Sequence, residues 1–284
     1  MAPNKLVAPV VKWVGGKRQL IKQIAPLIPK TYTTYCEPFL GGGAVLFHLQ
    51  PKHAVINDAN SDLIELYEVI RDSVEELIES LNGHENSADY FYNIRALDRD
   101  KDQYATLSPI DRASRLIYLN KTCYNGLFRV NNAGEFNTPF GAYKNPNIVN
   151  AVTLRAVSKY LRENDIILNN GDFAHVLKNL PERSFVYLDP PYDPISDSSA
   201  FTGYTSIGFG RNEQIRLKKY CNELNERGIR FLMSNSDTEF IRDQYSNYII
   251  DTVQAVRNIN SRGDRRGNVS EVLVRNYTAS RKRS

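Results

Sequence analysis

The sequence is poor in cysteine and has no long apolar run. Its three cysteines, Cys36, Cys123 and Cys221, are far apart, odd in number and form no CxxC pair, which argues against a disulfide scaffold and favours a reducing compartment. No stretch approaches the roughly 18 apolar residues that cross a bilayer, and the first residues lack the apolar core of a signal peptide. We therefore expect a cytoplasmic protein with no membrane role.

Histidine is also scarce. The four histidines, His48, His53, His84 and His175, have neither the mutual spacing nor the cysteine neighbours that suit a metal site. We therefore expect no metal cofactor.

A strong net charge is missing too, because the 284 residues carry a formal charge of only +4. The charge is unevenly distributed, however. Between Lys121 and Arg162 six basic residues face only Glu135, and the stretch that begins at Arg257 is basic again. Two basic surfaces suit a cleft that grips duplex DNA, because phosphate contacts supply most non-specific affinity. A solvated basic face without a partner is the alternative.

Strand-like and helix-like runs alternate along the chain, which predicts an α/β fold with a largely parallel sheet. Residues 120–150 lose this periodicity and are rich in Asn, Gly, Pro and aromatics, which indicates a loop-rich insertion. The expected strands are 35–39, 54–57, 166–169, 185–188, 229–233, 248–256 and 269–277; the expected helices are 17–28, a short one from Ala44, and 63–81.

The most specific motif is Asp189-Pro190-Pro191-Tyr192, directly after the apolar run 185–188. Strand ends are where ligands bind in this fold class. The exocyclic amine of adenine is a poor nucleophile, so an enzyme must accept hydrogen bonds from both of its N–H groups. The Asp189 carboxylate and the Pro190 carbonyl suit that task, Pro191 stiffens the loop, and Tyr192 would stack on the base. The motif therefore predicts methyl transfer to an amino group, driven by orientation and electrostatics.

Together with other segments, this motif resembles the DNA adenine-N6 methyltransferase (Dam) family, which includes the GATC methylases of restriction systems. The resemblance covers nearly the whole chain. In chain order the matching segments are 12–18 (KWVGGKR), 37–43 (EPFLGGG), 57–60 (NDAN), 124–129 (YNGLFR), 134–141 (GEFNTPFG) and 189–192 (DPPY). The order of cofactor motif, target-recognition insertion and catalytic motif is that of the α group of amino-methyltransferases.

The resemblance implies a Rossmann-like class I sheet that binds S-adenosylmethionine (SAM). Into this sheet is inserted a mainly helical target-recognition domain containing a β-hairpin. The implied catalytic domain comprises residues 1–60 and 163–284, and the implied DNA-binding domain comprises residues 61–162.

The resemblance also implies a cofactor site. Its matching positions are Trp13, Gly15, Gly16, Lys17, Phe39, Gly41, Gly43, Asp58, Asp172, Phe173 and Asp189. Asp58 would accept bonds from the ribose hydroxyls, and Phe173 would stack on the cofactor's adenine. Plainer interpretations stay open at this point: a tight glycine turn, a helix N-terminal charge for Asp58, and a capping Asp172 beside a core Phe173.

A DNA-binding surface is implied as well. The matching positions, together with the basic C-terminal loop, are Lys12, Tyr124, Asn125, Leu127, Arg129, Pro139, Tyr143, Lys144, Arg262, Arg265 and Arg266. Arg129 is expected to read a guanine, because its fork pairs bidentately with O6 and N7. A structural hairpin with a small aromatic cluster is the alternative.

The resulting hypothesis is methyl transfer from SAM to N6 of a flipped-out adenine in duplex DNA, with GATC as the favoured target. N4-cytosine methylation usually goes with Ser at position 189, and protein glutamine methylation usually goes with Asn there. A non-catalytic DNA-binding relative is a further alternative. Double-stranded DNA is the expected partner, and the resemblance raises a restriction endonuclease that acts on the same site. The sequence leaves the oligomeric state, a bacterial or phage origin, and an orphan or restriction-system role open.

Overall fold

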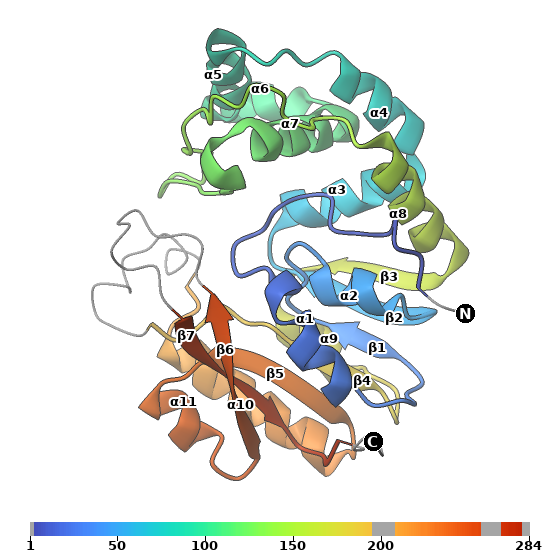
Figure 1. Cartoon of the computed structure of the whole chain (residues 1–284), viewed down its shortest axis with the longest axis vertical. Helices are drawn as coiled ribbons and strands as arrows, with labels where there is room; N and C mark the ends of the chain where they lie inside the picture. Colours follow the sequence, from blue (N-terminus) through green and yellow to red (C-terminus); the bar gives the residue numbers. More distant parts are fainter. Residues whose placement is uncertain (1–2, 195–207, 257–267, 280–284) are drawn as a thin grey trace. The chain divides into compact units, whose positions relative to one another are not determined.

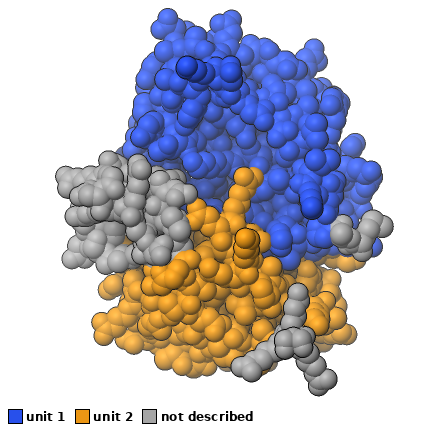
Figure 2. All heavy atoms as spheres, viewed as in Figure 1, with its two compact units in different colours: residues 1–16, 41–52, 60–170 blue, residues 17–40, 53–59, 171–284 orange. Residues whose placement is uncertain are grey.

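The computed structural model describes residues 3–194, 208–256 and 268–279 (Figure 1). The chain divides into two compact units (Figure 2). Unit 1 comprises residues 1–16, 41–52 and 60–170, and unit 2 comprises residues 17–40, 53–59 and 171–284. The expected division into a catalytic and a target-recognition domain concerns what each part binds, so it stays a prediction.

Seven described strands form one sheet, in the order β3-β2-β1-β4-β5-β7-β6. The pairs β1/β2, β1/β4 and β4/β5 are parallel, whereas β5/β7 and β6/β7 are antiparallel. This mostly parallel sheet confirms the expected α/β, Rossmann-like methyltransferase architecture. The strands are β1 (Tyr35–Glu37), β2 (His53–Asp58), β3 (Asp165–Asn170), β4 (Phe185–Leu188), β5 (Arg230–Ser236), β6 (Ile249–Val256) and β7 (Asn268–Arg275).

Three helices of unit 2, α9 (Phe173–Lys178), α10 (Arg211–Glu226) and α11 (Glu239–Gln244), share one core with the sheet. Leu217 of α10 and Ile241 of α11 are fully buried there with Phe231 and Met233 of β5. Strand β4 is buried along its whole length, as expected for a central parallel strand. The sheet core thereby fixes where the loop after β4 begins.

Unit 1 is mainly helical. Helix α7 contacts α3, α4 and α5, and a second buried cluster joins Phe91 of α5, Tyr118 and Leu119 of α7, and Phe136 of the insertion. Its helices are α2 (Ala44–Leu49), α3 (Ser61–Asp72), α4 (Val74–Asn82), α5 (Ala88–Ala96), α6 (Lys101–Thr106), α7 (Pro109–Thr122) and α8 (Ala151–Glu163), with 3-10 turns η3 (Leu97–Arg99) and η4 (Tyr124–Gly126). No helix in the described ranges is long and apolar enough to cross a membrane.

Two expected helices were wrong in extent. Residues 17–28 form three short pieces, η1 (Lys17–Gln19), α1 (Ile21–Ile24) and η2 (Ala25–Leu27), with Pro26 inside the last one. Residues 63–81 are divided between α3 and α4 at Ser73, whose φ of −139° and ψ of 46° are not helical. The apolar spacing continues across this break, so periodicity alone did not reveal it.

The loop-rich insertion has the character that its composition predicts. Between α7 and α8 the described backbone contains one 3-10 turn, η4, and two isolated bridges, Cys123 with Phe140 and Val130 with Phe136. The second bridge closes a hairpin-like turn around Gly134, which has a φ of +77°. The expected β-hairpin is therefore present as a pair of short bridged arms without a regular strand ladder.

Candidate active site

The candidate catalytic loop lies where the strand order of the sheet reverses. Strand β1 has β2 on one side and β4 on the other, and in open α/β sheets ligands bind beyond the carboxyl ends of strands at such a switch point. The segment that follows β1 starts at Pro38, and the segment that follows β4 starts at Asp189. The Asp189-Pro190-Pro191-Tyr192 motif is thus placed where the fold class binds ligands.

Asp189 is held by two donors on a single oxygen. The Lys17 ammonium lies 2.7 Å from Oδ1, and the Ser234 hydroxyl donates to the same atom at 3.0 Å. Burial raises the pKa of the Asp189 carboxyl, and the charge and hydrogen bonds of Lys17 and Ser234 oppose that rise. In the described part of the chain Oδ2 has no hydrogen-bond partner, so it remains an available acceptor.

Tyr192 is oriented by a carboxylate on β7. Its hydroxyl donates to Oε2 of Glu271 at 2.7 Å, and Glu271 is only 8% exposed. The Lys17 ammonium lies 4.6 Å from the centre of the Tyr192 ring, a favourable cation–π distance. Burial, with the nearby charges of Asp189 and Glu271, keeps the pKa of Tyr192 well above its ordinary value. Tyr192 is therefore a neutral, positioned ring.

The loop is also fixed from behind through its backbone. Gln214 of α10 donates to the Pro191 carbonyl at 2.7 Å, and Asn235 of β5 donates to Gln214 at 3.1 Å. Asn235 in turn accepts from the backbone N–H of Asp193 at 3.1 Å. No hydrogen bond to the Pro190 carbonyl occurs among the described residues. One carboxylate oxygen and one carbonyl are thus left as acceptors in a rigid loop.

Besides Lys17 and Asp189, four expected cofactor residues lie in unit 2, at or just after strand ends. Asp58 closes β2, and Phe39 follows β1 with its ring centre 5.3 Å from that of Phe173. Asp172 caps α9 by accepting from the Ala174 N–H at 2.9 Å, and Arg216 pairs with both of its oxygens. The Arg216 hydrogen bond lowers the pKa of Asp172.

Phe173 is 4% exposed and belongs to the core, with the Arg216 guanidinium 4.7 Å from its ring centre. The structural alternatives for Asp172 and Phe173, cap and core, are therefore both realised. A role of this pair in binding the cofactor's adenine stays a prediction.

In unit 1, the tryptophan of the N-terminal motif packs on the glycine turn. A Cβ atom at Gly41, where φ is +52°, would lie 3.1 Å from Cδ1 of Trp13. A Cβ atom at Gly43, where φ is +68°, would lie 2.7 Å from a ring carbon of Phe47. Gly15 also has a positive φ, +77°, and Gly16 donates to the Trp13 carbonyl at 3.2 Å. Positive φ angles favour glycine at these three positions, and a Cβ atom at Gly41 or Gly43 would also crowd an aromatic ring.

The structure brings most of the expected DNA-binding residues of the insertion together. Asn120 joins the Lys12 backbone through bonds of 2.8 Å in both directions, and the Lys12 ammonium donates to the Asn125 carbonyl. The Asn125 N–H donates to the Tyr143 hydroxyl at 2.9 Å, and the Tyr124 N–H donates to the Pro139 carbonyl at 2.8 Å. These residues, far apart in sequence, form one loop cluster.

Several side chains of this cluster face solvent. Tyr124 is 58% exposed and Tyr143 is 41% exposed, which is unusual for large aromatic rings. Arg129 and Lys144 are exposed, and Leu127 is half-buried. The Nε atom of Arg129 donates to Oδ1 of Asn137 at 2.7 Å, and its Nη2 atom donates to the Asn137 carbonyl at 3.5 Å. Exposed rings beside exposed cations suit nucleic acid.

Arg262, Arg265 and Arg266, expected to contact DNA from the C-terminal basic loop, lie outside the described residues. Within the described ranges, no group of three or more His, Cys, Asp or Glu side chains is arranged to hold a metal ion.

Sequence reasoning missed four residues that support the catalytic loop: Gln214, Ser234, Asn235 and Glu271. A signal existed for two of them, because Ser234 and Asn235 follow the apolar run 229–233 and polar residues at the end of a parallel strand are candidates for a site. Lys17 was assigned to the cofactor alone, and the structure shows it paired with Asp189.

Comparison with known proteins agrees with this geometry. Residues 13–259 match the family described as D12 class N6 adenine-specific DNA methyltransferase. The type II methyltransferase M1.LlaDCHI of Lactococcus lactis subsp. cremoris is 42% identical over 277 residues, covering 96% of this chain and 97% of that protein.

Two further relatives extend across most of the chain. The type II methyltransferase M.MjaIII of Methanocaldococcus jannaschii is 40% identical over 292 residues, covering 95% of this chain and 99% of that protein. The DNA adenine methylase of Escherichia coli K12 is 34% identical over 268 residues, covering 93% of each. The Asp189-Pro190-Pro191-Tyr192 motif stands at the switch point of the sheet, and the chain belongs to the D12 class of N6 adenine-specific DNA methyltransferases.

Proposed function

We propose that this enzyme transfers the methyl group of SAM to N6 of an adenine flipped out of duplex DNA, with GATC as its favoured target. The observation that carries the proposal is that the two carboxylate oxygens of Asp189 have different surroundings. Lys17 and Ser234 bind Oδ1, while Oδ2 and the Pro190 carbonyl have no partner among the described residues. Two acceptors in one rigid loop match the two N–H groups of the exocyclic amine.

The chain's own residues explain how the amine is activated. Accepting both N–H bonds withdraws the nitrogen lone pair from the ring and favours a pyramidal, nucleophilic nitrogen. Burial raises the pKa of Asp189 and the Lys17 ammonium opposes that rise, which favours the ionised carboxylate that accepts hydrogen bonds. Tyr192, held by Glu271, offers a ring face for stacking the flipped base. Orientation and fixed electrostatics thus supply the catalysis.

The residues present suit SAM as the methyl donor. When bound, SAM supplies an electrophilic methyl group on its sulfonium. Asp58, at the end of β2, offers a carboxylate for the ribose hydroxyls. The ring centres of Phe39 and Phe173 lie 5.3 Å apart. Glycines at positions 41 and 43 allow the positive φ angles of this turn, +52° and +68°, and keep side chains off its backbone, which suits the close approach of a ligand.

DNA binding rests on the loop cluster of unit 1. Lys12, Arg129 and Lys144 supply exposed positive charge, and the exposed rings of Tyr124 and Tyr143 supply stacking surface next to it. We assign base reading to Arg129, with Asn125, Leu127 and Pro139 beside it at the base edges. Arg262, Arg265 and Arg266 are proposed to add phosphate contacts.

The experiment that tests the proposal is methylation of random duplex DNA by the purified protein with labelled SAM, followed by mapping of the modified base and its flanks. We expect N6-methyladenine within GATC. Asp189→Asn is the matched control: it keeps the shape of the side chain but places an amide where an acceptor is needed, and turnover should fall by orders of magnitude. N4-methylcytosine as the product, or near-normal turnover of Asp189→Asn, would overturn the assignment.

A further inference from the structure

A ring stack in unit 1 connects two motifs that are distant in sequence. Trp13 and Phe128 lie with ring centres 4.6 Å apart and planes inclined by 21°. Trp13 belongs to the N-terminal cofactor motif, and Phe128 directly precedes Arg129 in the recognition loop. Both rings are half-buried. Offset stacks of this kind contribute beyond simple burial, so the two motifs are linked by a directional contact.

Trp13 also packs closely against the glycine turn. A Cβ atom at Gly41 would lie 3.1 Å from the indole Cδ1, and a Cβ atom at Gly42 would lie 3.3 Å from Cβ of Trp13. Closely packed groups transmit displacement because no empty space absorbs it. A ligand that enters the turn and shifts the indole therefore acts on Phe128.

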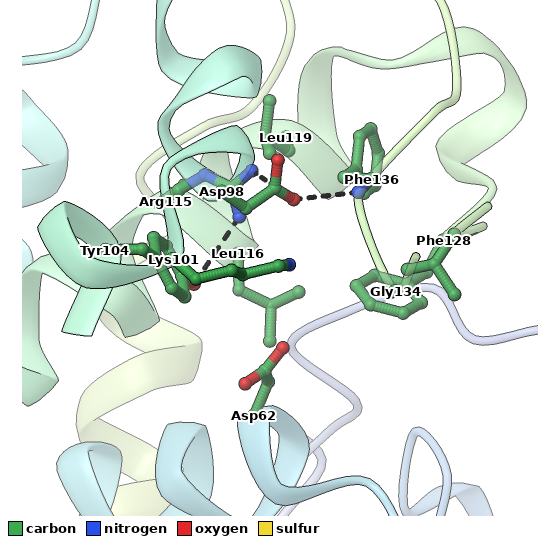
Figure 3. A pocket seen from close by; sticks show the side chains of 11 residues that line it. Asp62, Asp98, Lys101, Tyr104, Arg115, Leu116, Leu119, Phe128, Gly134 and Phe136 are labelled. Atoms are coloured by element: carbon green, nitrogen blue, oxygen red, sulfur yellow. Dashed lines mark hydrogen bonds and ion pairs between the residues drawn. The ribbon is translucent and has the colours of Figure 1, made fainter. Parts of the chain in front are cut away.

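Phe128 has room to respond. It lines a cavity of about 190 Å³ in unit 1, together with Phe136, Asp98 and Arg115 (Figure 3). Figure 3 shows Phe128 and Phe136 along one side of this cavity and Lys101 and Tyr104 along the other. The ring of Phe128 thus lies between a packed indole and open space, an arrangement that permits two positions.

The far arm of the recognition hairpin is fixed by a buried charge cluster. Asp98 accepts from the Phe136 N–H at 2.7 Å and from Arg115 at 2.8 Å, and the Asp98 and Arg115 side chains are 7% and 8% exposed. Arg99 donates to the Phe136 carbonyl at 2.6 Å. A shift of Phe128 is therefore not followed by the whole hairpin and acts instead on its neighbour, Arg129.

We propose that Phe128 is a positioning residue that couples cofactor binding at Trp13 to DNA reading by Arg129. The inference rests on the proposed function, in which the turn at Gly41 holds the cofactor and the recognition loop contacts DNA. Because coupling between two binding sites is reciprocal, each ligand should raise the affinity for the other by the same factor.

The test is a binding cycle with S-adenosylhomocysteine, which cannot donate a methyl group, and a GATC duplex. Calorimetry gives the dissociation constant for S-adenosylhomocysteine with and without the duplex, and the ratio measures coupling. We expect a wild-type ratio of about fivefold or more, the usual lower bound for coupled sites. Phe128→Leu should bind each ligand alone within about twofold of wild type but bring the ratio close to one.

Two matched variants separate coupling from simple packing. Phe128→Tyr keeps the stack and should retain the wild-type ratio. Phe140→Leu makes the same Phe→Leu change in the same insertion, at a ring that packs on Phe91 at 5.3 Å, and it should also retain the ratio. Trp13 is the only tryptophan of the chain, so its emission gives a second readout: the duplex alone should change it in wild type but not in Phe128→Leu.

Each contrary outcome has a distinct meaning. A Phe128→Leu ratio equal to that of wild type, or an equal loss in Phe140→Leu, would overturn the coupling role of Phe128 while leaving the proposed function intact. A wild-type ratio of one would do the same. Absence of S-adenosylhomocysteine binding in wild type would overturn the proposed function itself, and this inference with it.

Discussion

Replacing Lys17 with methionine tests the electrostatic design of the catalytic loop most directly. Methionine keeps much of the length of the side chain but removes the charge that lies 2.7 Å from Asp189. Lys17 is 5% exposed and Asp189 is 19% exposed, so neither charge is well solvated. Breaking such a buried pair from one side costs more than the pair contributes, because it leaves the other charge buried alone.

The magnitude follows from that burial. Removing one partner of a buried ion pair lowers the free energy of unfolding by about 3–5 kcal/mol. Asp189 is partly exposed and keeps its hydrogen bond from Ser234, so we expect a loss at the lower end for Lys17→Met, about 3 kcal/mol. Asp189→Asn should also lower the free energy of unfolding, because it removes the carboxylate charge that lies 2.7 Å from the Lys17 ammonium. The double variant removes both charges of the Lys17–Asp189 pair, so its free energy of unfolding should exceed the value expected from adding the two single effects by about 2 kcal/mol.

The pH dependence has a definite sign. Burial raises the pKa of Asp189 and Lys17 opposes the rise, so Lys17→Met should raise that pKa further. A carboxyl with a raised folded pKa contributes stability below its unfolded pKa of about 3.9, and that contribution is lost as pH rises through the folded value. The loss in free energy of unfolding caused by Lys17→Met should therefore be small in acid and should reach its full size at neutral pH. Its methyl-transfer activity should also need a higher pH, since the proposed mechanism uses the ionised carboxylate as the acceptor.

Denaturant unfolding of the four proteins in acid and at neutral pH measures the cycle, and the pH profile of kcat/KM measures the activity. Additive single and double effects at neutral pH would refute the proposed electrostatic coupling of Lys17 with Asp189. If the acid limb of this profile lies at the same pH in Lys17→Met as in wild type, the claim that Lys17 favours the ionised carboxylate is refuted.

Three further predictions follow from individual contacts. Gly43→Ala should destabilise the fold by about 2 kcal/mol or more, because its φ is +68° and the new Cβ would lie 2.7 Å from a ring carbon of α2. Gly134→Ala is the control in denaturant unfolding: φ is +77°, and no described residue other than its chain neighbours comes within 4 Å of the new Cβ, so it should show backbone strain alone. Glu271→Gln should lower kcat about fivefold in steady-state assays, because a neutral acceptor for Tyr192 is weaker by roughly 1 kcal/mol; an unchanged kcat would contradict the positioning role. Arg129→Ala should lose about 1–3 kcal/mol of discrimination at one base pair when all single-base variants of the target are compared, whereas a uniform loss would show that this residue only positions the duplex.

The sequence by itself determined the local features of this protein. Strand β4 was predicted with its observed bounds, because Phe185–Leu188 is an uninterrupted apolar run closed by Asp189 and two prolines. The glycine turn after β1 was also evident, since consecutive glycines after a strand indicate a tight turn. Motifs of this kind depend on neighbours within a few residues, and those neighbours are visible in the sequence.

Only the tertiary structure decided which distant residues meet. The pairing of Lys17 with Asp189, the bond from Tyr192 to Glu271, and the stack of Trp13 on Phe128 each join segments that are far apart in the chain. Their geometry depends on strand order and on how the loops pack, and apolar spacing carries no information about either. For the same reason Lys17 was assigned from its motif to the cofactor alone. The motif identifies the residue type, but tertiary packing determines that the Lys17 ammonium lies beside the Asp189 carboxylate.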